Sequence, residues 1–590
     1  MIRRSAASDG ALWALAVSGA LGFWLGAAVF AEWQVAVETA QVIARLVEYP
    51  PDNPFFIYHV RLWTVLHEAL ALLLRLGVWE LTASKLVSGL LGMFSLQALC
   101  MVIYAFSRSA MLATGGAFVV FLSHAAEIGG RYPISLMATQ HTYGAVGLSA
   151  IVLAAGLLGA GRYRLGGLLL GSLPAIHPGL GVWAFAIGAI CLASGFRQLG
   201  PMLRPAVPWF IAGVGFSAIS LIVHLAIAPD VAAAADPAAA DYLPTLVRLW
   251  DGHRQPVPLA HPAVYLNLAA IPLALTWLLV LSDRLPAASE FLLRFVVVTA
   301  GLAIAFVFIT WAPPEWIPDF IQILMPLRLL NIVSMMFAAV MVGLAGACRH
   351  KLPGQIVILV LLVAILLLPE SYFWPVMPEA LRRIVWGTPV ERMTVMLAGA
   401  LVVTLYALID KHVGLRQKAG DQSESSRAIP VIGTARNILL ALIILLSVAS
   451  LRDPWPRALK FRDRKHDPVF SAAAEGSGLL LTGQGVRLVQ LKTRRAVLLD
   501  TSGFDGLTYS LEAAPRMIHI LRDVYDIDLL SPPAEAPAET NRRAWGQYSR
   551  ERWQEIGRQY AVTQVLTFRN WSLRLPIVAE TADLRLYEIP

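Results

Sequence analysis

The stretch that decides the fold is Ala11–Ala31, ALWALAVSGALGFWLGAAVFA, in which no residue is charged. As an α-helix rising about 1.5 Å per residue, it is long enough to cross the hydrocarbon core of a bilayer, which is about 30 Å thick. A helix is required, because an open strand in lipid leaves its backbone groups without hydrogen-bond partners. Met1–Arg4 precede this run without a convincing cleavage pattern, so we expect a retained first transmembrane helix.

Similar apolar runs follow along most of the chain. Of its 590 residues, 57% are hydrophobic and 15% are charged, against about 45–50% and about 25% in an ordinary soluble domain. Counting the runs predicts a polytopic α-helical membrane protein with about 13 transmembrane helices. The two weakest predictions flank His177, and one broken element is the alternative there. The predicted helices are centred near Ser18, Met93, Phe118, Ile151, Leu169, Ile187, Gly215, Pro272, Ala303, Met336, Val363, Val402 and Ile444.

Lysine and arginine gather in the short connections between these runs, as at Arg162 and Arg164. The positive-inside rule therefore predicts that these connections and the N-terminus are cytoplasmic. We expect a membrane domain over 1–451, with a basic cytoplasmic linker at 411–436, in a bacterial-type inner (plasma) membrane. An odd number of spans then puts residues 452–590 outside, in the periplasm or its equivalent. The longer connections fall on that outer side, at 32–84, 127–142, 229–262 and 369–392.

The tail, residues 452–590, alternates strand and helix signals, which favours a small extracytoplasmic α/β domain. Amphipathic periodicity predicts helices over Arg516–Val524 and Arg550–Tyr560. Short apolar runs predict strands at Gly478–Thr482, Ala496–Asp500, Val562–Phe568 and Leu584–Ile589.

Several function classes are excluded by what the sequence lacks. The net charge is +8, but no basic stripe with interleaved aromatic residues follows it, so we expect no nucleic-acid partner. The three cysteines lie in or beside apolar runs and indicate no cysteine metal site. Nucleotide-binding loops, His-Glu-x-x-His and Gly-x-Ser-x-Gly are also absent from the sequence.

Three carboxylates of the first outer loop are candidate catalytic groups. Glu32 and Glu38 follow the first span, and Asp52 lies in a turn stiffened by prolines. A carboxylate here can act as a general base on an acceptor hydroxyl, or hold a divalent ion (Mg²⁺ or Mn²⁺) beside a phosphate. An ordinary interfacial carboxylate is the alternative for each. We favour Glu38, because a turn of chain separates it from the membrane, with Glu32 second and Asp52 third.

Four basic side chains are candidate substrate-binding groups. Arg131 and His141 lie in the second outer loop, where the planar guanidinium can pair with a phosphate and the imidazole can orient a hydroxyl. His177 lies beside Pro178 between two apolar runs, a costly position without a polar partner. Arg328 lies at the outer end of a span, where it either snorkels to the interface or binds an anion such as a polyprenyl phosphate.

With these features together, the chain resembles the GT-C superfamily of membrane glycosyltransferases, which use polyprenyl-phosphate-linked sugars. The likeness rests on the acidic first outer loop with a surface helix near 63–76, the many spans and an outer C-terminal domain. The tail resembles that of uncharacterised bacterial members, through Leu479–Thr482 (LLLT), Arg494–Asp500 (RRAVLLD) and Leu584–Ile589 (LRLYEI). One difference is that members of this superfamily usually carry an early Asp where this chain has glutamates.

This resemblance implies an inverting transfer of sugar from a polyprenyl-phosphate donor to an extracytoplasmic glycan or lipid acceptor, in envelope polysaccharide synthesis. Two other functions remain open at this point. One is a non-enzymatic transporter or assembly subunit of envelope polysaccharide export. The other is a membrane acyltransferase that uses His177 as its base.

Overall fold

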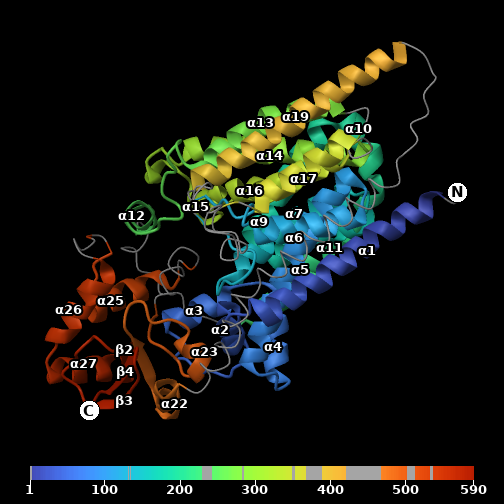
Figure 1. Ribbon diagram of the computed structural model, residues 1–590. Helices are drawn as coiled ribbons and strands as arrows, with labels where there is room; N and C mark the ends of the chain where they lie inside the picture. Colours follow the sequence, from blue (N-terminus) through green and yellow to red (C-terminus); the bar gives the residue numbers. More distant parts are fainter. Residues whose placement is uncertain are drawn as a thin grey trace.

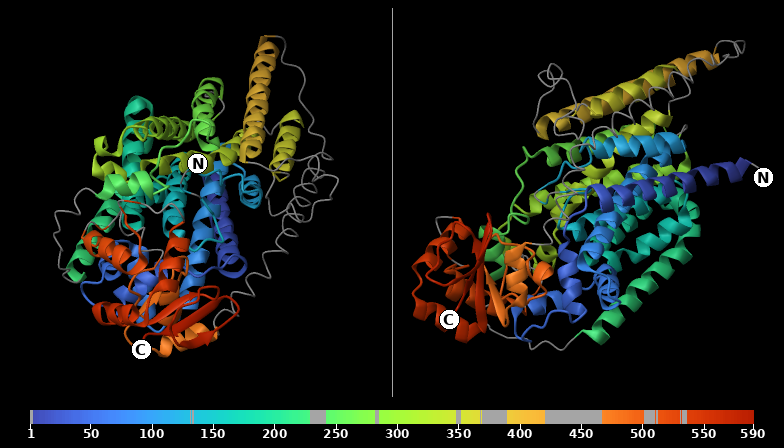
Figure 2. Two further views of the ribbon diagram at one scale, coloured as in Figure 1. Left: turned by 90° about the vertical axis from the view of Figure 1, so that its left-hand side faces the viewer. Right: turned by 60° about the horizontal axis from the view of Figure 1, so that its bottom comes forward.

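The computed structural model describes residues 3–130, 132, 134–228, 242–281, 285–347, 352–366, 368, 389–419, 467–500, 510, 512–529, 531 and 536–590. A bundle of long helices carries the C-terminal tail at one end, and the N-terminus lies at the other end (Figures 1 and 2). We call the first of these the tail end of the bundle. The tail and the N-terminus therefore lie at opposite ends of the bundle.

The long helices form the bundle, and among the described residues eight of them, alone or continued by a neighbour, are long and apolar enough to cross a membrane. A lipid bilayer is the environment that such helices require. The bundle elements are α1 (Arg3–Trp24), η1 (Leu25–Val29), α5 (Glu80–Ser107), α6 (Ala110–Leu122), α7 (Thr142–Gly159), α8 (Tyr163–Ile176), α9 (Pro178–Ser194), α10 (Phe196–Leu203), η2 (Arg204–Ala206), α11 (Val207–Ile227), α13 (Pro262–Leu281), α14 (Ala287–Ile309), α16 (Leu329–Ala347), α17 (Leu352–Leu366) and α19 (Pro389–Ala419).

The expected number of about 13 spans is not confirmed. Four of the predicted centres, at Phe118, Leu169, Ile187 and Val363, fall in helices of 13 to 17 residues, namely α6, α8, α9 and α17. A helix of that length is shorter than the roughly 20 residues needed to cross the hydrocarbon core without tilt or thinning. The centre at Ile444 lies outside the described residues.

Small residues set how closely the bundle helices approach. Gly22 and Gly26 on the first helix meet the α5 backbone at Gly92 and Ser88, so a Cβ at either glycine would collide with a carbonyl group. Gly171 of α8 has the same relation to the α11 backbone. Apolar lipid supplies little force to drive helices together, so such close van der Waals contact is the main source of their association.

Shorter elements cover the tail end of the bundle. The segment 32–79 forms α2 (Val35–Ile43), α3 (Pro54–Arg61) and α4 (Val65–Arg75), and α3 and α4 meet at 107°. Asn53 caps α3 by accepting from the Phe55 amide at 2.8 Å, as its short side chain favours. A helix is present near 63–76, as α4, and its expected position at the membrane surface stays a prediction. The remaining short elements at this end are α12 (Tyr242–Leu249), η4 (Pro314–Trp316), α15 (Asp319–Ile323) and η5 (Pro326–Arg328).

The tail is a mixed α/β layer, as expected. Its strands β1 (Leu479–Thr482), β2 (Val562–Phe568), β3 (Ile577–Glu580) and β4 (Leu584–Glu588) lie in the order β1-β2-β4-β3, with only β1 and β2 parallel. The strand expected at Ala496–Asp500 is reduced to a single parallel bridge between Val497 and Leu480. The tail helices are α22 (Pro468–Glu475), α23 (Val489–Thr493), α25 (Ala514–Tyr525), α26 (Pro537–Gln547) and α27 (Arg550–Tyr560).

The core of the tail is completed by segments from the rest of the chain. Phe55 of α3 is fully buried against the inner face of the sheet, beside Leu480 and Leu566. The apolar face of α12 packs into the same half of the molecule, and the Trp250 indole donates to the Leu529 carbonyl at 2.6 Å. The tail is therefore packed onto the bundle rather than hanging from it.

Candidate functional site

Arg328 and His177 meet at the tail end of the bundle, although 151 positions separate them in the sequence. The Arg328 Nη1 lies 3.0 Å from His177 Nε2, and its guanidinium carbon lies 4.5 Å from the centre of the Tyr132 ring. All three groups come from connections between helices, and both Arg328 and His177 are more than nine-tenths buried. The structure thus joins two of the four basic residues that the sequence singled out.

The chain positions these two side chains through helix breaks. His177 lies between the end of α8 and Pro178, which begins α9 because proline needs no amide hydrogen bond there. Arg328 ends η5, directly before α16. Both groups are therefore fixed at the ends of apolar helices.

Two donors point at the His177 ring, which as a neutral imidazole can accept only one hydrogen bond. Arginine has donors only, so His177 Nε2 must be the acceptor in its contact with Arg328. The Leu180 amide also points at this ring, 3.3 Å from Nδ1. A neutral imidazole has a single acceptor nitrogen, so only one of these two contacts can be a full hydrogen bond. An anion that took over Arg328 would leave His177 to cap α9 alone.

Aromatic and histidine rings extend this cluster on both sides. Tyr143 stacks on His177 with ring centres 4.3 Å apart, and His67 of α4 lies 5.5 Å beyond Tyr143. On the other side Tyr132 contacts His253 at 5.2 Å. We call Arg328, His177, Tyr132, Tyr143 and His67 the cationic cluster. Sequence reasoning missed its two tyrosines, whereas His67 left a signal by interrupting an apolar helix.

Glu38, the favoured base, is sealed beneath the tail. It is 0% exposed, and neither carboxylate oxygen has a hydrogen-bond partner among the described residues. Burial raises its pKa well above the ordinary glutamate value, and the nearby Asp500 carboxylate raises it further. The Leu491 backbone and the Lys492 ammonium offset part of this rise, although neither is at hydrogen-bond geometry.

A buried amide network closes the tail over Glu38. The Gln490 amide nitrogen of α23 donates to the Glu38 carbonyl at 2.9 Å and to Gln41 Oε1 at 3.2 Å. Gln41 in turn donates to the Leu491 carbonyl at 3.2 Å, and the Tyr49 hydroxyl donates to Gln490 Oε1 at 2.6 Å. Gln41 and Gln490 are fully buried. We call the side chains of Gln41, Tyr49 and Gln490 the amide network.

Three of the four other sequence candidates fall within the described residues. Glu32 is half-buried, and its amide donates to Ser88 Oγ at 3.2 Å. Asp52 is exposed and forms an ion pair with Arg516 of the tail at 3.2 Å. His141 is exposed directly before α7. Arg131 lies outside the described residues.

The described residues contain no group of three or more His, Cys, Asp or Glu side chains that could hold a metal ion. Glu38 and Asp500 bring two carboxylates near each other, one fewer than such a group needs. We therefore assign no residues to the divalent cation that the sequence led us to consider, and no step below uses one.

Comparisons with protein-family models, with characterised proteins and with solved structures give no match for this chain. The features of the molecule that bear on its function are the cationic cluster, the sealed carboxylate and the bundle that carries them.

Proposed function

We propose that this protein is a membrane glycosyltransferase that moves a sugar from a polyprenyl-phosphate donor to a glycan or lipid acceptor outside the cytoplasm, in envelope polysaccharide synthesis. The observation that carries the proposal is the cationic cluster. It offers a buried guanidinium at the end of an apolar helix, where an ionisable side chain is costly unless it has a functional or structural partner such as an anion. The likeness of the chain to the GT-C superfamily supports the same reaction.

In this proposal Arg328 holds the donor phosphate. Its planar guanidinium matches a phosphate through two parallel N–H···O contacts, a stronger arrangement than the one hydrogen bond that it donates to His177 Nε2. Once the phosphate takes those donors, His177 Nδ1 is free to accept from Leu180. As the sugar leaves, negative charge grows on the phosphate oxygen, and a fixed Arg328 stabilises that charge.

The reaction then needs a group to remove the acceptor proton. A carboxylate of the 32–79 segment takes the hydroxyl proton, the acceptor oxygen forms a bond to the anomeric carbon, and the bond from that carbon to the phosphate oxygen breaks. The electron pair leaves with the polyprenyl phosphate. Glu38 is our first candidate for this base, since its raised pKa is shifted in the direction that proton abstraction near neutral pH needs. Because it is sealed, the α23 segment must move before an acceptor can reach it.

The test is turnover by the full chain reconstituted in nanodiscs. A panel of polyprenyl-phosphate hexoses, pentoses and amino sugars is supplied with envelope glycan or lipid acceptors, and released polyprenyl phosphate is measured. We expect release with one donor, and a loss of about 100- to 1,000-fold in Arg328→Ala, the scale for losing a charge-stabilising donor. The turnover of Arg328→Lys, which keeps the charge, should fall between that of the natural chain and that of Arg328→Ala.

The matched control is Arg294→Gln. Arg294 also lies on a bundle helix, α14, but it is not part of the cationic cluster. Its Nη2 donates to Gln198 Oε1 at 3.0 Å. Turnover in this variant should stay near that of the natural chain. If no donor of the panel releases lipid phosphate, or if Arg294→Gln loses as much as Arg328→Ala, the proposal fails.

The proposal also requires the tail end to lie outside the cytoplasm. The basic short connections predict this orientation through the positive-inside rule. A reporter enzyme fused after Pro590 that works only in the cytoplasm should be inactive, while one that works only outside should be active. The opposite pattern would put the cationic cluster on the wrong side of the membrane for this reaction.

A further inference from the structure

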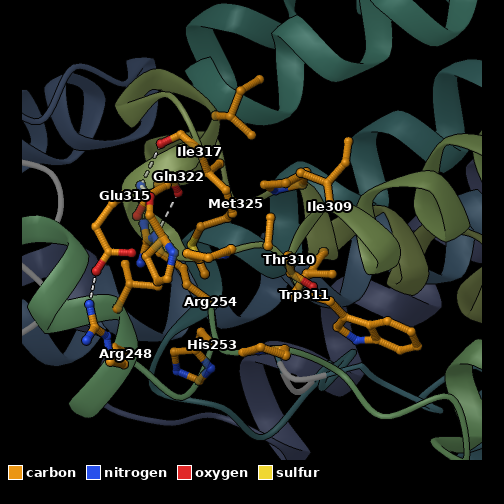
Figure 3. A pocket seen from close by; sticks show the side chains of 18 residues that line it. Arg248, His253, Arg254, Ile309, Thr310, Trp311, Glu315, Ile317, Gln322 and Met325 are labelled. Atoms are coloured by element: carbon orange, nitrogen blue, oxygen red, sulfur yellow. Dashed lines mark hydrogen bonds and ion pairs between the residues drawn. The ribbon is translucent and has the colours of Figure 1, made fainter.

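A cavity lies beside α12 and the connection that follows α14. It has a volume of about 370 Å³ and is lined by residues of α12, of the 253–256 turn, of the end of α14 and of the 310–327 connection. This volume is at the lower end of the range for small-molecule sites, so the cavity has room for a headgroup rather than for a whole lipid. Figure 3 shows the side chains that line it.

The walls of this cavity are strongly amphipathic. Ile309 and Met325 contribute apolar surface, whereas Arg254, His253 and Gln322 contribute polar groups (Figure 3). Leu327 adds to the apolar part of the lining. Such a division suits a molecule with a polar head and an apolar remainder. A soluble polar metabolite would leave the apolar surface uncovered.

The surroundings indicate that the cavity lies beside lipid. Trp316 and Phe320, on the same connection, are 78% and 61% exposed, and Trp311 at the cavity wall is 44% exposed. Exposed tryptophan and phenylalanine at the end of membrane helices are typical of the interface between hydrocarbon and headgroups. A lipid can therefore enter from the bilayer with its chains outside the cavity.

Gln322 supplies a fixed acceptor in the wall. Both hydrogens of its amide are used, because Nε2 donates to the Pro314 and Ile317 carbonyls at 2.9 Å each. The side chain is 5% exposed, and its Oε1 has no partner among the described residues. A buried carbonyl oxygen without a donor costs about 1–3 kcal/mol. A ligand hydroxyl would remove that cost.

The charges around the cavity are paired within the protein. Arg248 forms an ion pair with Glu315, and Arg254 forms one with Asp251. The Arg254 Nε also donates to the backbone carbonyl of Gln322 at 2.7 Å. This pairing favours a neutral, hydroxylated headgroup over a phosphate, in contrast to the anion site expected at Arg328.

We propose that this cavity binds the headgroup of a neutral glycolipid, with a sugar hydroxyl donating to Gln322 and the lipid chains in the bilayer. This inference does not depend on the transfer reaction proposed above, because binding is observable without turnover.

The test is native mass spectrometry of the full chain, released from phosphocholine detergent with monoglucosyl diacylglycerol added. We expect one glucosyl lipid retained per chain, and no retention of phosphatidylcholine, whose headgroup has no hydrogen-bond donor. Gln322→Leu, which removes the acceptor, should lower retention by about tenfold, the equivalent of one buried hydrogen bond. Ala312→Trp, which fills the cavity without touching its polar groups, should abolish retention.

The control is Trp316→Ala, which changes the exposed surface outside the cavity lining and should keep the lipid. Monodisperse elution and unchanged thermal unfolding identify the variants that fold. Equal retention of phosphatidylcholine, or retention that survives Ala312→Trp, would overturn the proposal. So would polyprenyl phosphate binding in place of the glucosyl lipid with the same dependence on Ala312, since the cavity would then belong to the donor site.

Discussion

The tail meets the 32–79 segment through two unlike halves. On one half, Glu38, Gln41 and Gln490 are completely excluded from solvent. On the other half, Arg61 pairs with Glu512 and Asp52 pairs with Arg516, with side chains about two-fifths or more exposed. Both halves join the same two parts of the chain, and the difference between them is how deeply their polar groups are buried. A buried polar group gains or loses far more from its partner than an exposed one does.

The largest difference between the two halves is expected for substitutions of their carboxylates. Glu38→Gln should lower sugar transfer by about 100- to 10,000-fold, the usual effect of removing a general base, whereas Asp52→Asn on the exposed half should lower it little. Turnover is compared at matched membrane levels on a donor that the natural chain uses. Glu32→Gln is measured beside them as the second candidate. If all three variants keep near-normal rates, the 32–79 segment does not supply the base.

The amide network should hold more of the stability of the interface than any exposed pair. Gln490→Leu leaves the Tyr49 hydroxyl proton without its acceptor and Gln41 Oε1 without its donor, so we expect a loss of about 1–3 kcal/mol in the free energy of unfolding. A double-mutant cycle with Gln41→Leu should show a smaller effect of the second substitution than of the first. Strictly additive losses in denaturant unfolding would mean that the two glutamines act independently.

The dependence of stability on pH should also distinguish the buried half from the exposed half. The folded state holds the Glu38 proton more tightly than the unfolded state, because burial raises its pKa. This contribution is complete below about pH 4.3, the ordinary glutamate pKa, and is lost as the pH rises through the folded-state pKa. Glu38→Gln should therefore become more stable than the natural chain as the pH is raised. A thermal unfolding difference that stays constant from about pH 4 to about pH 8 would contradict this.

The exposed pairs should give the smallest effect. Arg61→Ala should change the free energy of unfolding by at most about 1 kcal/mol, and the change should shrink further at about 1 M salt. Glu80→Gln is the intermediate case, because the Glu80 side chain is buried while its partner Arg494, 2.5 Å away, is half exposed. A larger loss at Arg61 than at Glu80 would reverse the order that burial predicts.

Sequence patterns predicted what depends on local composition. The apolar run at Ala11–Ala31 predicted the first helix, and amphipathic spacing predicted α25 and α27. The missed strand β3 is short and mostly exposed, so it has no apolar alternation to detect. The run Ala496–Asp500 is apolar enough for a strand, but only Val497 pairs with its neighbour.

The candidate site was harder, because its contacts join distant parts of the chain. His177 and Arg328 were each identified as costly polar groups among apolar runs, but no local pattern could show that one would be the partner of the other. Gln41 and Gln490 left no signal at all, since a single glutamine is ordinary on any polar face. Their meaning depends on burial, which only the packed structure reveals.

The shared core of the tail has a consequence for how the protein is made. Tyr49 accepts a hydrogen bond from the Val497 amide, 448 positions later in the chain. At about 5–20 residues per second, a ribosome needs roughly 20–90 s to cover that distance. Throughout this interval the apolar face around Phe55 lacks the sheet that later covers it, and the apolar face of α12 lacks the tail from the moment it is made. The growing chain is thus aggregation-prone until its last strands emerge, and its yield in a foreign host should depend on how fast it is translated and on which chaperones meet it.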